Sequence, residues 1–136
     1  MLSANLRTFV VAAAMTAMAA VAALAQAMMG PAMTAATPLG TILVGPNGMT
    51  LYTYDNDTAP NVSTCYGGCA TNWPPFVVEA GAVAAGDWTI VPRTDGTNIW
   101  AYMGKPLYYY AQDTAPGQTN GNQPTATWHV VVITAM

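Results

Sequence analysis

The chain has 136 residues, of which 53% are hydrophobic and only 7% are charged. Three lysine and arginine residues stand against six aspartate and glutamate residues, which gives a net charge of -3. This balance excludes a nucleic-acid-binding protein that holds phosphates on a basic surface, and it excludes a highly charged disordered tail. The apolar excess is concentrated in residues 1–36, whereas the scarcity of charge persists along the whole chain.

The first 27 residues have the features of an export signal. Arg7 supplies an early positive charge, an apolar run over residues 9–23 follows, and small residues then allow cleavage after Ala25 or Ala27. This order is typical of a secretory signal peptide with a helical apolar segment. The run is about 15 residues long, whereas a membrane-spanning helix needs roughly 20. We therefore expect residues 1–27 to be removed, leaving no transmembrane anchor.

Residues 28–38 contain methionines and prolines without a regular period, so we predict a flexible lead-in there. A single domain over residues 39–136 is expected to follow. In it, turn residues separate short runs rich in β-branched and aromatic residues, which predicts an all-β fold. The expected strands are residues 41–45, 49–54, 88–93, 98–102, 107–110 and 127–133.

Local signals refine this prediction. The Asn47-Gly48 pair favours a hairpin between the first two strands, because both residues tolerate a positive φ. The last run has apolar residues on both faces and predicts a central, buried strand. One or two turns of helix are expected near Cys69–Trp73.

The domain contains an internal repeat at an offset of 56 residues. Residues 48–60 align with residues 104–116 without a gap, and eight of the thirteen positions are identical. In each copy, two tyrosines on one face of a strand are followed by an Asp-Thr-Ala-Pro turn. Because a lone hairpin is only marginally stable, two copies, at about residues 41–75 and 97–133, are predicted to pair around one core as a small, mostly antiparallel β-meander.

The two copies share the motif Tyr-x-Tyr-x-x-Asp. Its residues are Tyr52, Tyr54 and Asp57 in the first copy and Tyr108, Tyr110 and Asp113 in the second. With the Cys-x-Gly-x-Cys-Ala-x-x-Trp-Pro-Pro pattern of residues 65–75, the motif resembles that of the bacterial secreted lipoprotein repeat family with the Tyr-x-(Phe/Trp/Tyr)-x-x-Asp motif. The resemblance covers residues 39–133 and implies a small exported envelope protein without assigning an activity. The chain lacks the family's lipoprotein cysteine, which favours a soluble periplasmic or secreted form.

Cys65 and Cys69 are the only cysteines. In the oxidising environment outside the cytoplasm, such a pair predicts a disulfide that closes a short loop. The alternative is a metal or thiol-redox site, because some copper chaperones use a Cys-x-x-x-Cys pair with a distant histidine, and His129 is the sole histidine. Soft thiolate ligands with an imidazole suit copper. In the other interpretation, His129 is a hydrogen-bonded residue of a strand.

The motif residues also allow two interpretations. Asp57 and Asp113 are expected to stabilise turns, with a shared ion as the alternative. The four motif tyrosines are expected to form the core, with the stacking of a flat ligand as the alternative.

No nucleophile elbow, second histidine or pair of glutamates is present, so no enzymatic activity is predicted. The sequence favours a non-enzymatic envelope module without a cofactor, which acts on an unknown partner or small ligand or as structural support. The alternative is a periplasmic copper-binding or thiol-redox-linked protein that uses Cys65, Cys69 and His129.

Overall fold

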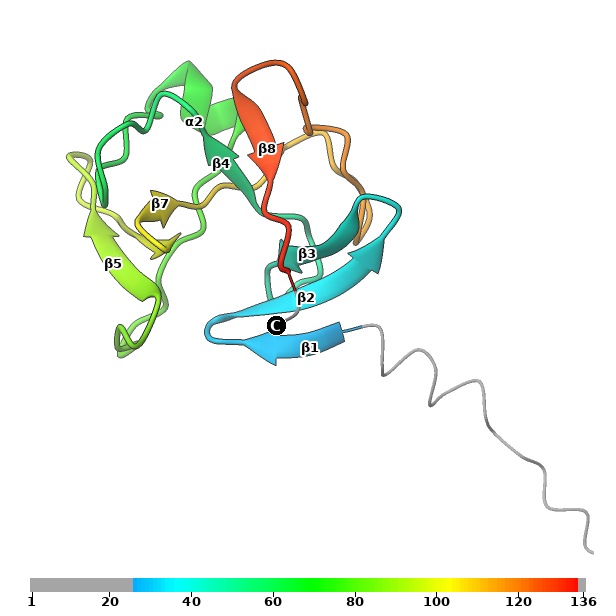
Figure 1. Ribbon diagram of the computed structural model, residues 1–136. Helices are drawn as coiled ribbons and strands as arrows, with labels where there is room; N and C mark the ends of the chain where they lie inside the picture. The colour runs from blue at the N-terminus through cyan, green and yellow to red at the C-terminus, as the bar shows by residue number, and fades with distance from the viewer. Residues whose placement is uncertain (1–25, 135–136) are drawn as a thin grey trace, which may run out of the picture.

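The computed structural model describes residues 26–134, which form short antiparallel strands and one five-residue helix (Figure 1). The elements are β1 (Gln26–Met29), β2 (Ala32–Thr37), β3 (Gly40–Val44), β4 (Tyr52–Tyr54), α2 (Gly68–Asn72), β5 (Trp88–Pro92), β6 (Asn98–Tyr102), β7 (Lys105–Pro106) and β8 (Trp128–Val130). The predicted all-β, mostly antiparallel fold is confirmed. The predicted export signal lies outside the described residues, apart from its last two. No helix in the described part of the chain is long and apolar enough to cross a membrane.

Each of the two main sheets has three strands and contains one hairpin of the repeat, β2–β3 or β5–β6. β1, β2 and β3 make one sheet, and β5, β6 and β7 make the other. β2 and β3 begin the first repeat, and β5 and β6 begin the second at close to the same offset of 56 residues. The predicted turn at Asn47-Gly48 forms, with Gly45 N donating to Met49 O at 2.8 Å. Gly48 has a φ of 80°, whereas Asn47 does not adopt a positive φ. The duplicated hairpin therefore exists as expected, although each copy includes an earlier strand.

The segment 28–38 is not the flexible lead-in that its irregular spacing predicts. It contains the end of β1 and all of β2, and β2 pairs along its length with β3. Ala32 is fully buried, and the turn between β1 and β2 is made by Gly30 at a φ of 62°. Alanine has a low intrinsic preference for strands, so only pairing with a neighbouring strand makes this segment extended.

Each repeat ends in a segment that pairs with the other repeat. β8, from the second repeat, pairs with β4 of the first, and residues 131–133 continue along β3. Residues 76–78, from the first repeat, lie in the same way along β6 of the second. The matching hydrogen bonds are Leu43 N to Val131 O (2.9 Å) and Ile133 N to Thr41 O (2.7 Å), and Trp100 N to Phe76 O (2.9 Å) and Val78 N to Asn98 O (2.9 Å). The last segment of each repeat therefore pairs with the other repeat, and we call these two segments exchanged. The repeats as the structure defines them are residues 32–78 and 88–133.

The final strand differs from its prediction. It is regular only over β8, and Val132 is 49% exposed. In the described residues, β8 pairs with a single strand, β4, in a two-stranded sheet, and residues 131–133 then bond to β3, so the final segment is not flanked by strands on both sides. The prediction of a central strand buried on both faces is wrong for this reason.

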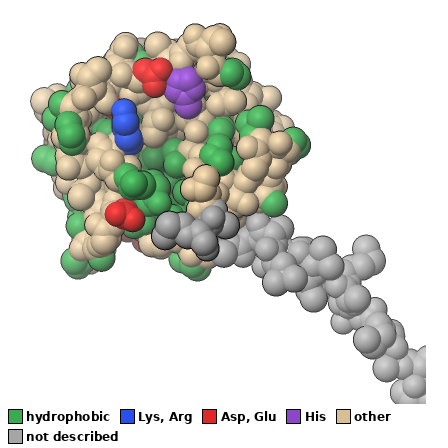
Figure 2. Space-filling model, in the orientation of Figure 1, with side chains coloured by type: hydrophobic (Ala, Val, Ile, Leu, Met, Phe, Trp, Pro, Cys, Tyr) green, Lys and Arg blue, Asp and Glu red, His purple; other side chains and the backbone are tan. Residues whose placement is uncertain are grey.

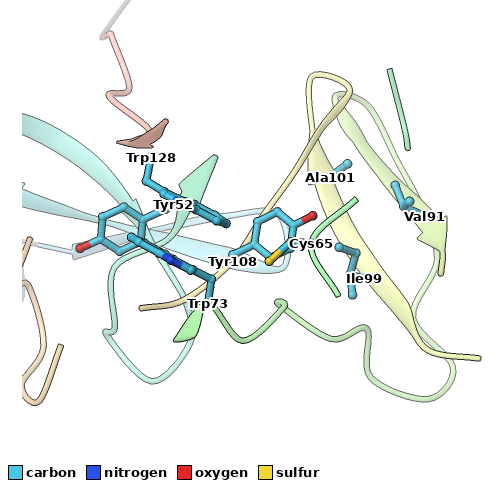
Figure 3. Packing of buried hydrophobic residues seen from close by; sticks show 8 residues of the cluster. All are labelled: Tyr52, Cys65, Trp73, Val91, Ile99, Ala101, Tyr108 and Trp128. Atoms are coloured by element: carbon cyan, nitrogen blue, oxygen red, sulfur yellow. The ribbon is translucent and has the colours of Figure 1, made fainter. Parts of the chain in front are cut away.

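The main core lies where the two repeats meet. Figure 3 shows the rings of Tyr52, Trp73 and Trp128 gathered together, with Tyr108 and the sulfur of Cys65 beside them. Tyr52 and Tyr108 are fully buried. A second cluster around Leu43, Leu51, Trp88, Trp100 and Leu107 fills the space between the sheets.

Candidate functional site

The repeated motif forms a reciprocal contact between the repeats. The backbones of Tyr52 and Tyr108 exchange two hydrogen bonds, of 2.7 and 3.0 Å. The Tyr52 hydroxyl donates to Oδ2 of Asp113 at 2.5 Å, and the Tyr108 hydroxyl donates to Oδ2 of Asp57 at 2.6 Å. Each tyrosine therefore binds the aspartate of the other repeat, and we call these two hydrogen bonds the Tyr–Asp clasp.

The same aspartates hold the loops that follow them. Oδ1 of Asp57 accepts from the backbone N–H of Thr64 at 2.8 Å, and Oδ1 of Asp113 accepts from the N–H of Asn120 at 3.0 Å. Both bonds span seven residues, so the two loops have equivalent closures. With one oxygen on its own loop and the other on the opposite repeat, each carboxylate couples turn formation to repeat pairing.

The tyrosine hydroxyls are held in their protonated form. Burial raises the pKa of Tyr52 and of Tyr108, and the hydrogen bonds to Asp113 and Asp57 raise it further. A tyrosinate beside a buried carboxylate would place two negative charges in contact. These hydroxyls consequently act as donors to the carboxylates.

Arg93 extends one half of the clasp. Its side chain is completely buried, donates to Ser63 Oγ at 2.5 Å and to Cys65 O at 2.7 Å, and lies 4.1 Å from the centre of the Tyr66 ring. Ser63 Oγ is 2.6 Å from the Tyr108 hydroxyl. A continuous buried chain therefore leads from the guanidinium to Asp57. Arg93 Nε has no hydrogen-bond partner.

Sequence reasoning missed this role of Arg93. The available signal was that Arg93 is one of only three cationic side chains in the chain and is the last residue of the predicted strand 88–93. A buried charge needs compensation from its surroundings. Asp95, two residues later, forms a 3.5 Å ion pair with Arg93, but the buried partners Ser63 and Cys65 lie 30 and 28 residues earlier in the sequence.

Four aromatic rings form a column through the molecule. Tyr54 stacks on Trp128 with ring centres 4.2 Å apart, Trp128 stacks on Trp73 at 3.9 Å, and Trp73 stacks on Tyr110 at 4.2 Å. The rings come alternately from the first and second repeats. Tyr54 and Tyr110 therefore stack on tryptophans of the protein itself. These tryptophans occupy the ring faces on which the alternative interpretation would stack a flat ligand.

The cysteines and the histidine are engaged separately. Cys65 and Cys69 form a disulfide with a Cα–Cα distance of 5.3 Å, as predicted, and α2 begins inside this loop. His129 Nε2 lies 2.9 Å from Oδ2 of the exposed Asp55. Across residues 26–134, no three histidine, cysteine, aspartate or glutamate side chains form a group that could hold a metal ion.

Apolar hollows open between the two sheets. The largest described one has a volume of about 570 Å³, and we call it the Met103 cleft. It is lined by Met29, Asp87, Tyr102, Met103, Val132, Ile133 and Thr134. On the face shown in Figure 2, apolar side chains gather with few charged side chains among them.

A second hollow is lined by the other exchanged segment, that of the first repeat. It has a volume of about 370 Å³ and includes Phe76, Val77 and Glu79. Val77 and Val132 occupy matching positions in the exchanged segments, and each is about half exposed. The lining of each hollow therefore includes one half-exposed valine and one carboxylate, Glu79 in this hollow and Asp87 in the Met103 cleft.

These features define a small all-β module of two exchanged repeats, closed by a short disulfide loop. The sequence pattern of a family described as a secreted repeat of unknown function matches residues 33–77 and 89–132, more than half of the chain. The chain belongs to this family of secreted repeats, and the matched segments include β2 and β5 as parts of the repeat. No curated protein and no solved structure matches the chain.

Proposed function

We propose that this exported protein is a non-enzymatic binding module of the periplasm or the extracellular space, and that it holds a small apolar ligand in the Met103 cleft without a cofactor. The observation that carries the proposal is the cleft itself. Its volume of about 570 Å³ falls within the range of roughly 300–1,000 Å³ that is typical of small-molecule sites.

The lining of the cleft indicates the chemistry of its ligand. Met29 and Met103 have flexible, polarisable side chains that adapt to apolar ligands of different shape. Val132 and Ile133 add apolar surface, and Asp87 supplies a carboxylate. The favoured ligand has an apolar body and one positively charged or hydrogen-bond-donating group.

The placement of the titratable side chains supports a non-enzymatic role. Asp57 and Asp113 accept hydrogen bonds from buried tyrosines, and Cys65 and Cys69 are joined to each other. General acid–base catalysis requires a group that can exchange a proton with a substrate. These four residues instead stabilise the loops and the contact between the repeats.

The binding proposal is tested with the neutral fluorescent probe N-phenyl-1-naphthylamine. We expect saturable binding by the wild-type protein and at least tenfold weaker binding by Val132→Asp, which places a charge in the cleft. Val83→Asp is the matched control, because Val83 is 82% exposed and does not line the cleft. Equal affinity of both variants for the probe would contradict the proposed site.

The copper alternative has its own measurement. It requires the disulfide to be reduced, since thiolates and not a disulfide bind copper. Copper(I) is added to the reduced protein and to its His129→Ala variant. Stoichiometric binding that the variant loses would replace the present proposal with a copper-binding role.

A further inference from the structure

The exchange of strands makes the interface between the repeats the centre of the fold. The backbone pair Tyr52–Tyr108, the Tyr–Asp clasp and the stacked rings of Trp73 and Trp128 all join one repeat to the other. A repeat without its partner would expose these rings and leave Asp57 or Asp113 without its tyrosine donor. Each repeat is therefore complete only when another repeat pairs with it.

The interface itself does not require both repeats to belong to one chain. Every contact in it is non-covalent, and the disulfide lies within the first repeat. The connection between the repeats is the segment 79–87, in which every residue except Ala82 is exposed. A second copy of the chain can supply the same partner surface.

The connecting segment is longer than its path requires. Val78 bonds to Asn98 on one side of β6, and Trp88 pairs with Tyr102 from the other side. The path runs about 13 Å along β6 and crosses two strand spacings of about 5 Å, which gives a span of roughly 16 Å. The ten steps from Val78 to Trp88 can reach about 33 Å. The connection is therefore long enough for the two repeats of one chain to pair with each other, which gives the closed monomer.

We propose that the inter-repeat interface is also an association surface for a second copy of this chain. In the resulting dimer, the first repeat of each copy pairs with the second repeat of the other, and residues 79–87 act as the hinge. This arrangement is closed by a two-fold axis, so it ends at a dimer. A short flexible connection gives an effective concentration on the order of 1 mM, which sets the protein concentration at which dimer and monomer compete.

The test changes only the length of the connection in the full chain. Deleting residues 80–86 leaves Glu79 and Asp87, which span at most about 11 Å and cannot close the monomer. We expect this variant to be a folded dimer at micromolar concentration by sedimentation equilibrium. The matched control lacks only residues 80–82, still reaches about 24 Å, and should remain a monomer.

The wild-type chain gives a second, independent measurement. Refolding at about 1 mM should trap a substantial dimer fraction that survives dilution, whereas refolding at about 1 µM should give monomer only, because the effective concentration lies near 1 mM. A folded monomer of the short-linker variant would overturn the proposal. So would a short-linker variant that does not fold while the control folds, because the repeats would then be unable to pair between copies.

Discussion

The two halves of the Tyr–Asp clasp are built alike and supported differently. The loop after Asp57 is closed by the Cys65–Cys69 disulfide and contacts the buried Arg93. At the position equivalent to Cys65, the other loop has Gly121, whose N–H donates to the Tyr52 hydroxyl at 3.2 Å. Among the described residues, the second loop contains no disulfide, and no buried cation bonds to it.

The difference shows two ways of stabilising the same hydrogen bond. A Cβ at Gly121 would lie 2.7 Å from the Trp73 ring, so the second loop depends on a close approach of its backbone to the aromatic column. The first loop cannot pack in this way, because Cys65 carries a side chain there. It is held instead by a covalent link and by a charged hydrogen-bond donor. The repeat preserves the clasp, while its surroundings have diverged.

The largest expected effect is that of removing the buried cation. Arg93→Met deletes the charged donors to Ser63 Oγ and to Cys65 O in a buried site, so we expect a loss of about 3–4 kcal/mol in the free energy of unfolding. Urea denaturation measures this loss. Thr37→Met, at the equivalent position of the first repeat, should cost less than about 1 kcal/mol. Similar losses in the two variants would show that Arg93 contributes no more to the stability of the protein than Thr37 does.

The next largest loss in the free energy of unfolding is expected when either tyrosine hydroxyl of the clasp is removed. Tyr108→Phe removes the one hydroxyl that bonds to both Asp57 Oδ2 and Ser63 Oγ, and we expect it to cost about 2–3 kcal/mol. Tyr52→Phe removes one donor from Asp113 and should cost about 2 kcal/mol. Tyr54→Phe is the control, because its hydroxyl bonds only to the exposed Asn56. If Tyr54→Phe destabilises the protein as much as the other two, the clasp is not what holds the repeats together.

Opening the disulfide should have a somewhat smaller effect. For a five-residue loop, the chain-entropy model gives a loss of about 2 kcal/mol on reduction. The double variant Cys65→Ala, Cys69→Ala should therefore remain folded at room temperature, with a lower midpoint of thermal unfolding. The second loop keeps its structure by packing and without a disulfide. Complete unfolding of this variant would contradict the prediction, because it would mean that the first loop cannot fold without its covalent link.

The smallest effect of a single substitution is expected on the slope of the free energy of unfolding against pH at alkaline values. Burial raises the pKa of Tyr52 and Tyr108 above the ordinary range and raises the pKa of Tyr109 to about 12. Above about pH 10, the unfolded chain loses these protons while the folded chain keeps them, so the unfolded state binds fewer protons and stability falls as pH rises. Below pH 10 this contribution is fully present.

Each tyrosine should contribute up to about 1.4 kcal/mol per pH unit to this decline. Free energies of unfolding measured between pH 9 and roughly pH 11.5, below the pKa of about 12 of Tyr109, give the slope. Tyr52→Phe should reduce it by one such contribution. An unchanged slope would indicate that Tyr52 ionises as readily in the folded protein as in the unfolded chain.

Local sequence signals predicted the elements whose structure depends on near neighbours. The Asn47-Gly48 turn, the disulfide between Cys65 and Cys69 and the short helix after it all involve partners within a few residues. Self-comparison of the chain predicted the duplication, because identical residues at a constant offset do not depend on the fold. The strand β2 was missed, because its alanines become extended only through pairing with β3.

The chain's sparing use of charge was likewise evident from composition, and it excluded whole classes of function. The tertiary structure alone decided that Arg93 is buried, that each motif tyrosine binds the aspartate of the other repeat, and that the two final strands are exchanged. These are contacts between residues 20 to 92 positions apart. A motif specifies what each repeat can offer, but only the packing of both repeats around the shared aromatic column determines which partner each group meets.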